Sequence, residues 1–286
     1  MISDITLGQF FPGNSVLHRM DPRTKIILAV IFIAAIFVAN TPVAFFAMSV
    51  VTILLVAVSE ISIKVVIKGI KPIIFILIFT SLLNIFMTVG ASEPLLEFYF
   101  IKIYKEGIIR AIFMSLRVTL LIVGSSMFLT YTTSPITLTD GIESLLSPFK
   151  RIKLPVHEFA MMMSIALRFI PTLVEETEKI MNAQKSRGAD FSSGGLLKRA
   201  KALIPILVPL FVSSFKRADE LATAMECRCY RGDVGRTKLV KLRYHSLDAL
   251  GMIISVVALG AIICSNVLPP IFPSDSTWYT ILFYQI

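Results

Sequence analysis

Charged residues are scarce in this sequence. They make up 16% of its 286 residues, whereas soluble domains average about 25%, and 55% of the residues are hydrophobic. Cysteine is also rare, and three residues are too few for a disulfide-stapled secreted domain. A GxxxxGK[ST] sequence is missing, which excludes ATP hydrolysis through a phosphate-binding loop of that type. The composition therefore favours a membrane protein that does not itself hydrolyse ATP.

Residue sets that support catalysis or metal binding are also missing. His157-Glu158 resembles the start of a zinc-protease motif, but the second histidine of that motif does not follow. Cys227 and Cys229 could supply two ligands of a tetrahedral zinc site, but no clustered histidine or second cysteine pair supplies the other two ligands. No nucleophile with a neighbouring base is evident. We therefore expect no catalytic residue, no metal site and no cofactor bound by this chain.

Long uncharged runs are what the sequence has instead. They cover Ile26–Ser59, Pro72–Ser92, Val118–Thr139 and Ala249–Ser274. A spanning helix needs roughly 20 apolar residues, and Asn40-Thr41-Pro42 divides the first run of 34 residues into two helices, the first one short. The sequence therefore predicts an all-α integral membrane protein with about five transmembrane helices, at 25–40, 42–59, 72–91, 110–132 and 246–266.

Individual residues support these boundaries. Asp21-Pro22, Pro42 and Pro72 stand where helices should begin, because proline is tolerated in the first helical turn. Arg117 falls inside the fourth span, where an unpaired charge is costly. We favour a structural pairing of Arg117 with a neighbouring helix over a direct functional role.

Basic residues are concentrated in one segment. Residues 134–245 hold 18 of the 28 Lys and Arg, together with 11 of the 19 Asp and Glu. Cytoplasmic loops of membrane proteins carry such an excess of positive charge. This predicts a multi-pass protein of the cell membrane with a cytoplasmic N-terminus and an extracellular C-terminus, where Trp278 and Tyr279 could rest at the membrane interface.

The basic segment has its own organisation. A short helix starts at Ser134-Pro135 and stops at Ser147-Pro148, and two long helices are predicted within 155–188 and 191–232. We therefore divide the chain into an N-terminal arm with four spans (1–133), a cytoplasmic module of long amphipathic helices (134–245), and a last span with its tail (246–286).

Both long helices end on an arginine between small residues. Ser186-Arg187-Gly188 closes the first, and Cys227-Arg228-Cys229 closes the second. A cation near a helix C-terminus stabilises the helix through its dipole, which is the simplest explanation for either arginine alone. Two such ends in one module favour a second explanation, in which each arginine docks into an acidic groove of a dimeric partner. The planar guanidinium group suits this role because it binds carboxylates through two parallel hydrogen bonds.

The sequence also resembles a known family, the transmembrane T component of energy-coupling factor (ECF) transporters, in the branch with a shared energising module. The resemblance rests on "GNSVLHRMDPRTK" (13–25), "KGIKPI" (68–73), "SIALRFIPTL" (164–173) and "SSFKRADELATAM" (213–225), and runs from the N-terminal arm to about residue 243. It implies that Arg187 and Arg228 insert into grooves on two ATP-binding-cassette ATPase subunits, which bind ATP and Mg²⁺. The second motif usually carries glycine where Cys229 stands, so we expect Gly232 to take over as the C-cap residue.

The resemblance further implies a third partner, a small and interchangeable membrane subunit that binds a vitamin or other micronutrient. Methionine surfaces adapt to different partners, so one compatible feature is the methionine content of the two long helices, although core filling is the simpler explanation. Prolines within the same helices would supply bends. The residues assigned to this contact are Met161, Met162, Met163, Pro171, Pro205 and Pro209.

Two other functions remain open at this stage. A self-sufficient secondary transporter or channel would need ionisable residues at the membrane midplane and inverted repeats. A scaffold or nucleic-acid anchor would use the basic module, whose 11 acids among 18 bases make a poor surface for a polyanion. We therefore expect the lipid bilayer and protein subunits as partners, and no nucleic acid.

Overall fold

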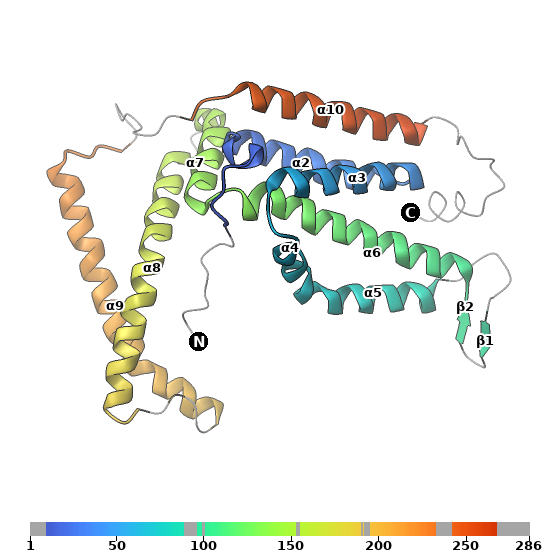
Figure 1. Cartoon of the computed structure of the whole chain (residues 1–286). Helices are drawn as coiled ribbons and strands as arrows, with labels where there is room; N and C mark the ends of the chain where they lie inside the picture. Colours follow the sequence, from blue (N-terminus) through green and yellow to red (C-terminus); the bar gives the residue numbers. More distant parts are fainter. Residues whose placement is uncertain are drawn as a thin grey trace. The chain divides into compact units, whose positions relative to one another are not determined.

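The computed structural model describes residues 10–88, 96–98, 101–152, 155–189, 191, 195–232 and 242–267. Its helices are α1 (Val16–Arg19), α2 (Pro22–Val38), α3 (Pro42–Ser59), α4 (Ile63–Ile70), α5 (Ile74–Met87), α6 (Lys105–Ser125), α7 (Pro135–Leu146), α8 (Val156–Ser186), α9 (Leu196–Cys227) and α10 (Ser246–Val267) (Figure 1). Tighter or wider helical turns occupy Lys71–Ile73, Ser126–Tyr131 and Ser147–Ile152. The predicted all-α membrane fold is confirmed. The sequence did not predict the short antiparallel hairpin of β1 (Leu96–Phe98) and β2 (Ile101–Ile103).

Local capping explains where α2 and α3 begin. Asp21 precedes α2, and its side chain accepts a hydrogen bond of 2.9 Å from the backbone N–H two residues further on. Thr41 precedes α3 and accepts one of 3.2 Å from the N–H three residues on. Pro22 and Pro42 are the first helical residues, where a missing N–H costs nothing. Both predicted starts are confirmed.

Among the residues that the structure describes, four helical segments are long and apolar enough to cross a membrane, namely Pro42–Ser59, Ile63–Met87, Lys105–Tyr131 and Ser246–Ser265. The first predicted span is α2, whose 17 residues rise about 26 Å and are therefore short for a hydrocarbon core of about 30 Å. The predicted third span corresponds to α5, which begins at Ile74 directly after the helical turn Lys71–Ile73 that contains Pro72. Amphipathic α4, which precedes that turn, was not predicted, because its exposed lysines interrupt the uncharged runs.

The chain forms two compact units. The transmembrane unit comprises the described residues of 9–141 and 242–286. The two-helix unit comprises the described residues of 142–241 and is built mainly from α8 and α9. The predicted C-terminal tail with Trp278 and Tyr279 lies outside the described residues.

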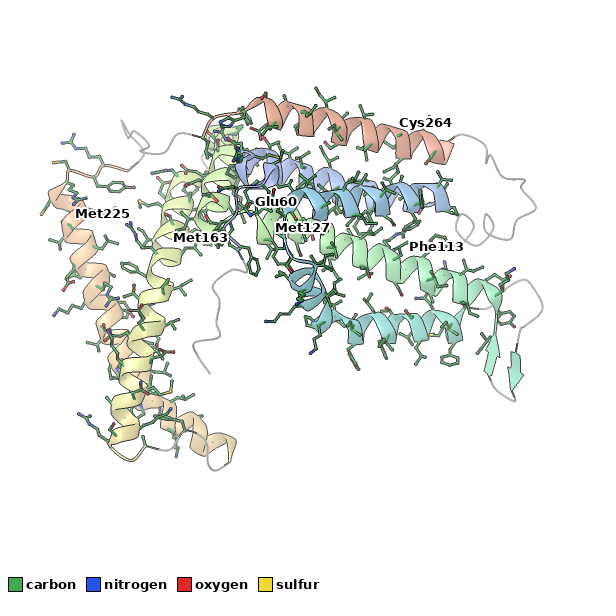
Figure 2. All side chains as sticks on the ribbon, viewed as in Figure 1. Glu60, Phe113, Met127, Met163, Met225 and Cys264 are labelled. Carbon is green, nitrogen blue, oxygen red and sulfur yellow. The ribbon has the colours of Figure 1, made fainter. Side chains whose placement is uncertain are left out.

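The core of the transmembrane unit lies between α2, α3, α6 and α10, with α1 at one end. Ile36 of α2 is fully buried there. Gly124 of α6 lies directly against the ring of Phe32, and a Cβ at this position would overlap that ring. Small residues allow transmembrane helices to approach closely in this way. On the outside, large apolar side chains such as Phe46 and Phe75 are 72% and 77% exposed, which suits contact with lipid. Figure 2 draws the side chains of the described residues as sticks along the helices.

Arg117 of α6 has a structural partner, as the sequence favoured. Its guanidinium donates to the carbonyl oxygen of Ala39 at 2.8 Å and to Asn40 Oδ1 at 3.1 Å. It also lies over the ring of Phe45, 5.2 Å from the centroid. Ala39 is the C-cap residue of α2, so the cation satisfies a carbonyl at a helix end and complements the helix dipole.

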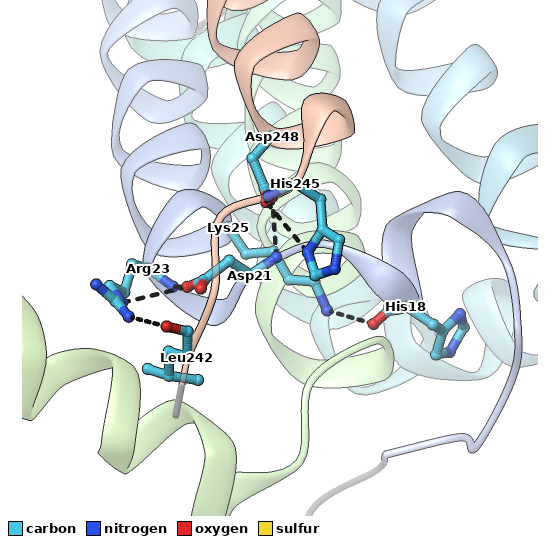
Figure 3. A network of polar contacts seen from close by, with 7 residues as sticks. All are labelled: His18, Asp21, Arg23, Lys25, Leu242, His245 and Asp248. Carbon is cyan, nitrogen blue, oxygen red and sulfur yellow. Dashed lines mark hydrogen bonds and ion pairs between the residues drawn. The ribbon is translucent and has the colours of Figure 1, made fainter. Parts of the chain in front are cut away.

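A buried carboxylate joins α10 to the start of α2 in the transmembrane unit (Figure 3). Asp248, 2% exposed in the first turn of α10, accepts from the backbone N–H of Asp21 at 2.9 Å. Its second oxygen accepts from the N–H of His245 at 2.7 Å. The two aspartates are 227 residues apart in the sequence. Asp248 therefore caps its own helix and fixes the start of α2 against it.

Two cations complete this junction (Figure 3). Lys25 is 2% exposed, and its ammonium donates to the carbonyl oxygen of Thr132 at 2.9 Å and to the hydroxyl of Thr133 at 3.2 Å. Arg23 donates to the carbonyl oxygen of Leu242 at 3.0 Å. The segment that enters α10 and the residues that follow the helical turn Ser126–Tyr131 are thereby tied to the first turns of α2.

Candidate functional site

The first arginine closes α8 in a defined geometry. Arg187 is the C-cap residue, and Gly188 follows it with φ +86° in the left-handed region. The N–H of Gly188 donates to the carbonyl of Lys185 at 2.9 Å, and the N–H of Ala189 donates to that of Gln184 at 3.0 Å. These two bonds form a Schellman motif, which satisfies carbonyls that the end of a helix leaves without partners.

The second arginine closes α9 with the same pair of bonds. Arg228 is the C-cap residue. The N–H of Cys229 donates to the carbonyl of Glu226 at 2.8 Å, and the N–H of Tyr230 donates to that of Met225 at 3.1 Å. The two helix ends, which we term the α8 tip (186–188) and the α9 tip (227–229), therefore share one backbone design.

The residue in the left-handed position of the α9 tip is Cys229, with φ +56°. The expectation that Gly232 would take over as the C-cap residue is wrong. Gly232 also has a positive φ, +74°, but it lies beyond the two cap bonds. A side chain in the left-handed region costs roughly 1–2 kcal/mol, and the two hydrogen bonds to otherwise unsatisfied carbonyls offset this cost.

Both tips are open to solvent. Ser186, Arg187 and Gly188 are exposed, and so are all three residues of the α9 tip. In the part of the chain that the structure describes, neither guanidinium has an ion-pair partner. Each arginine thus presents its full set of donors at the end of a long helix, which is the arrangement needed to bind a carboxylate of another protein.

The helices that carry the tips pack against each other within the two-helix unit. Ile206 of α9 is buried, at 4% exposure. Arg217 of α9 lies 4.0 Å from Glu176 of α8, and both side chains are 30% exposed, so this ion pair contributes little stability.

Helix α9 is a single element although it contains Pro205 and Pro209, and Figure 1 shows it changing direction along its length. Proline removes a backbone hydrogen bond and bends a helix in this way.

One face of α9 is apolar and exposed. Its residues recur in pairs every four positions, which places them along one side of the helix, and Phe211 and Phe215 are 61% and 73% exposed. We term this the α9 apolar face; it consists of Leu203, Ile204, Leu207, Val208, Phe211, Val212 and Phe215. A continuous apolar surface of this kind marks a contact with a partner protein or with a membrane.

Four of the predicted partner-contact residues lie on α8, where two of the methionines are exposed. Met162 and Met163 are 54% and 50% exposed, and Met161 is partly buried; Met163 is labelled in Figure 2. Pro171 on α8 is exposed, as are both prolines of α9. Core filling therefore does not explain Met162 and Met163 within this chain. The sequence analysis assigned Pro205 and Pro209 of α9 to this contact but did not name the residues of the α9 apolar face.

His157 has a structural role at the start of α8. Its Nδ1 lies 2.9 Å from Glu143 Oε1, and the two side chains are 5% and 8% exposed. The pair fixes the first turn of α8 to α7, so the ring nitrogen that faces Glu143 is engaged. Among the described residues, no group of three or more His, Cys, Asp or Glu side chains gathers as a metal site would require.

Comparison with known proteins adds independent information. A family model described as CbiQ, cobalt transport protein, matches residues 13–239. The chain is 50% identical to the energy-coupling factor transporter transmembrane protein EcfT of Clostridium kluyveri over 272 residues, which is 95% of this chain and 99% of that protein. It is 56% identical to the EcfT protein of Ruminiclostridium cellulolyticum over 257 residues, covering 90% and 95%. It is 48% identical to that of Bacillus subtilis over 263 residues, covering 92% and 98%.

Proposed function

Because the chain belongs to the CbiQ family, as a transmembrane (T) component of energy-coupling factor transporters, we propose that it is the coupling subunit of an ATP-driven importer of vitamins or other micronutrients. In this proposal the chain has no catalytic residue. It transmits the motion of two ATP-binding-cassette ATPase subunits to a small membrane subunit that binds the cargo. ATP and Mg²⁺ are bound by the ATPase subunits and not by this chain.

The observation that carries the proposal is the matched geometry of the two tips. Arg187 and Arg228 follow long helices, are exposed, and stand beside the same pair of cap hydrogen bonds. Two equivalent cationic ends suit a partner that presents two equivalent acidic grooves, which a pair of ATPase subunits provides. The cap fixes the backbone on either side of each arginine, so little backbone conformational entropy is lost when the guanidinium binds.

The second contact involves the exposed apolar surface of the two-helix unit. We propose that the α9 apolar face, with Met162 and Met163 of α8, contacts the cargo-binding subunit and the lipid around it. A surface of methionine and branched aliphatic side chains accommodates partners of different shape. This property suits a module that serves several interchangeable subunits.

Force would pass through the long helices. When ATP binding closes the ATPase pair, the two tips move with it, and the apolar surfaces of α8 and α9 shift against the cargo-binding subunit. That subunit then reorients in the bilayer and releases its cargo inside the cell. The proposal places the two-helix unit and the N-terminal arm in the cytoplasm and the C-terminus outside, as the excess of Lys and Arg in residues 134–245 suggests.

The experiment is copurification of the chain with its ATPase pair and its small membrane subunit. Arg187→Ala and Arg228→Ala should each weaken ATPase binding by about tenfold or more, because each removes charge-assisted hydrogen bonds. The double variant should lose the ATPase pair and abolish uptake while it remains folded in the membrane.

Two exposed cations next to the tips provide matched controls. Lys185→Ala and Arg231→Ala remove one positive charge each within three residues of a tip arginine, and we expect both to retain the ATPase subunits. The docking role is wrong if the double arginine variant copurifies at full yield and transports normally. A general effect of positive charge is indicated instead if the control variants lose binding equally.

The rival function, a self-sufficient secondary transporter, receives no support from Arg117. This residue is the charge that the sequence places well inside a predicted span, and its guanidinium is engaged by Ala39, Asn40 and Phe45. A cation that caps a helix end is a structural element rather than an ion or substrate site. Transport by the purified chain alone would favour the rival function.

A further inference from the structure

The two tips share a backbone design but differ in side-chain chemistry. The α8 tip carries Ser186 and Gly188 beside its arginine, whereas the α9 tip carries Cys227 and Cys229. Both cysteines are free and exposed. Cys229 also occupies a left-handed position, φ +56°, that glycine occupies in the α8 tip and that a residue with a side chain adopts only at a cost. The α9 tip thus holds two accessible thiols on either side of its exposed arginine.

From this arrangement we propose that the α9 tip is a reversible thiol-modification site, which takes a low-molecular-weight disulfide and thereby switches off docking of one ATPase subunit. The inference rests on the proposed function of Arg228, and extends it by a regulatory step that acts on the α9 tip and not on the α8 tip. The cytoplasm keeps thiols reduced in ordinary conditions, and cytosolic disulfides are usually transient and redox-sensing. The switch would therefore respond to oxidation of the cell's thiol pool.

The chemistry is a single thiol–disulfide exchange. The thiolate of Cys227 or Cys229 attacks one sulfur of the small disulfide, a new S–S bond forms to the cysteine, and the other half leaves as a thiolate. The cysteine sulfur is oxidised, one sulfur of the small disulfide is reduced to a thiol, and its other half is retained in the mixed disulfide, so no further oxidant is needed. Excess small thiol reverses the step by the same exchange.

Modification would act directly on the docking group. A glutathione-type adduct places bulk and carboxylates next to Arg228. These carboxylates can occupy the guanidinium fork, which would otherwise bind an acidic group of the partner. The α8 tip has no thiol, so Arg187 keeps its ATPase contact. Oxidation should therefore leave a complex that has lost one of its two ATPase attachments.

The third cysteine provides an internal comparison. Cys264 is also exposed, but it lies on α10 within the apolar segment Ser246–Ser265, where a bilayer would surround it. A thiolate is disfavoured in lipid, and a water-soluble disulfide does not reach it there. We therefore expect modification at the α9 tip in preference to α10.

The test uses the full chain in lipid nanodiscs and glutathione disulfide as the probe. Intact-mass and peptide analysis locate the adduct, and the affinity for the ATPase subunits is measured with and without the probe, then after addition of reductant. We expect an adduct at Cys227 or Cys229. The affinity of the α9 tip for its ATPase subunit should fall by about tenfold or more, and this affinity should recover fully in reductant. The Cys264→Ser variant should respond as the original protein does.

The matched variant is C227S/C229G, which gives the α9 tip the Ser-Arg-Gly sequence of the α8 tip. Its affinity should be the same with and without glutathione disulfide. The proposal is overturned if the original protein is modified at the α9 tip and binds the ATPases undiminished, or if the adduct forms only on Cys264. The Arg228→Ala variant, measured under reducing conditions without the probe, distinguishes failure of the docking function from failure of the thiol switch. If it binds as tightly as the original protein, the docking function is wrong; if it binds weakly while the modified protein binds normally, only the switch is wrong.

Discussion

Replacement of Asp248 should destabilise the transmembrane unit more than replacement of any exposed acidic residue. Its carboxylate accepts from the backbone N–H of Asp21 at 2.9 Å and from that of His245 at 2.7 Å, and its side chain is almost fully buried. In Asp248→Ala both bonds are lost, and both N–H groups lose their acceptor. Hydrogen bonds to a charged group contribute about 1.5–3 kcal/mol each, so the expected loss is about 3–6 kcal/mol.

Asp248→Asn refines the test. The amide keeps one acceptor oxygen but replaces the other with a donor, which faces an N–H group. We expect this variant to lose about 1.5–3 kcal/mol, which corresponds to one of the two bonds. Asp219→Ala, a change at an exposed acidic residue of α9, serves as the control and should alter stability by less than about 0.5 kcal/mol.

The assay is thermal unfolding of the purified chain in one detergent at one scan rate, because membrane proteins often unfold irreversibly and Tm then depends on the rate. At roughly 2–4 °C per kcal/mol for a chain of this size class, Asp248→Ala should lower the apparent Tm by at least about 6 °C. A decrease of under about 1 °C in Asp248→Ala would show that the junction between α2 and α10 does not depend on this carboxylate.

Three further changes test other parts of the structure. Arg117→Met keeps an apolar stem but removes the cap on α2, and should lower stability by about 1.5–3 kcal/mol in the same unfolding assay. Gly188→Ala places a Cβ in the left-handed region, so amide hydrogen exchange in the last turn of α8 should accelerate about fivefold; Cys229→Gly should slow exchange at the end of α9 by a similar factor. Phe211→Ser, alone or with Phe215→Ser, should reduce copurification of the small membrane subunit while the ATPase pair remains bound, because it removes exposed apolar area from the α9 apolar face.

Each of these predictions has an opposing result. Unchanged stability in Arg117→Met would mean that water or lipid headgroups satisfy the end of α2 equally well. Faster exchange in Cys229→Gly would mean that the cysteine side chain itself supports the cap. If Phe211→Ser removes the ATPases together with the small subunit, the α9 apolar face maintains the two-helix unit instead of forming a separate contact.

The sequence alone determined the elements whose causes are local. Uncharged runs located the spans, because a bilayer requires continuous apolar surface. Asp21-Pro22 and Thr41-Pro42 located helix starts, since a cap depends on residues within one turn. The pair of arginines at helix ends was also visible, because Arg187 is followed by a glycine that commonly terminates helices. Amphipathic α4 is not evident from the sequence, since its lysines interrupt the uncharged runs that indicate a membrane span.

The tertiary structure decided which distant groups meet. Asp248 and Asp21 are 227 residues apart, and no periodicity or local motif in either segment indicates that a buried carboxylate of one would accept from the backbone of the other. The partner of Arg117 depends on how α6 packs against the end of α2, a matter of three-dimensional contact. The structure also decided the conformation of Cys229, where two cap hydrogen bonds override the preference of a residue with a side chain for negative φ. Local propensities act over a few residues, whereas these pairings depend on the packed arrangement of whole helices.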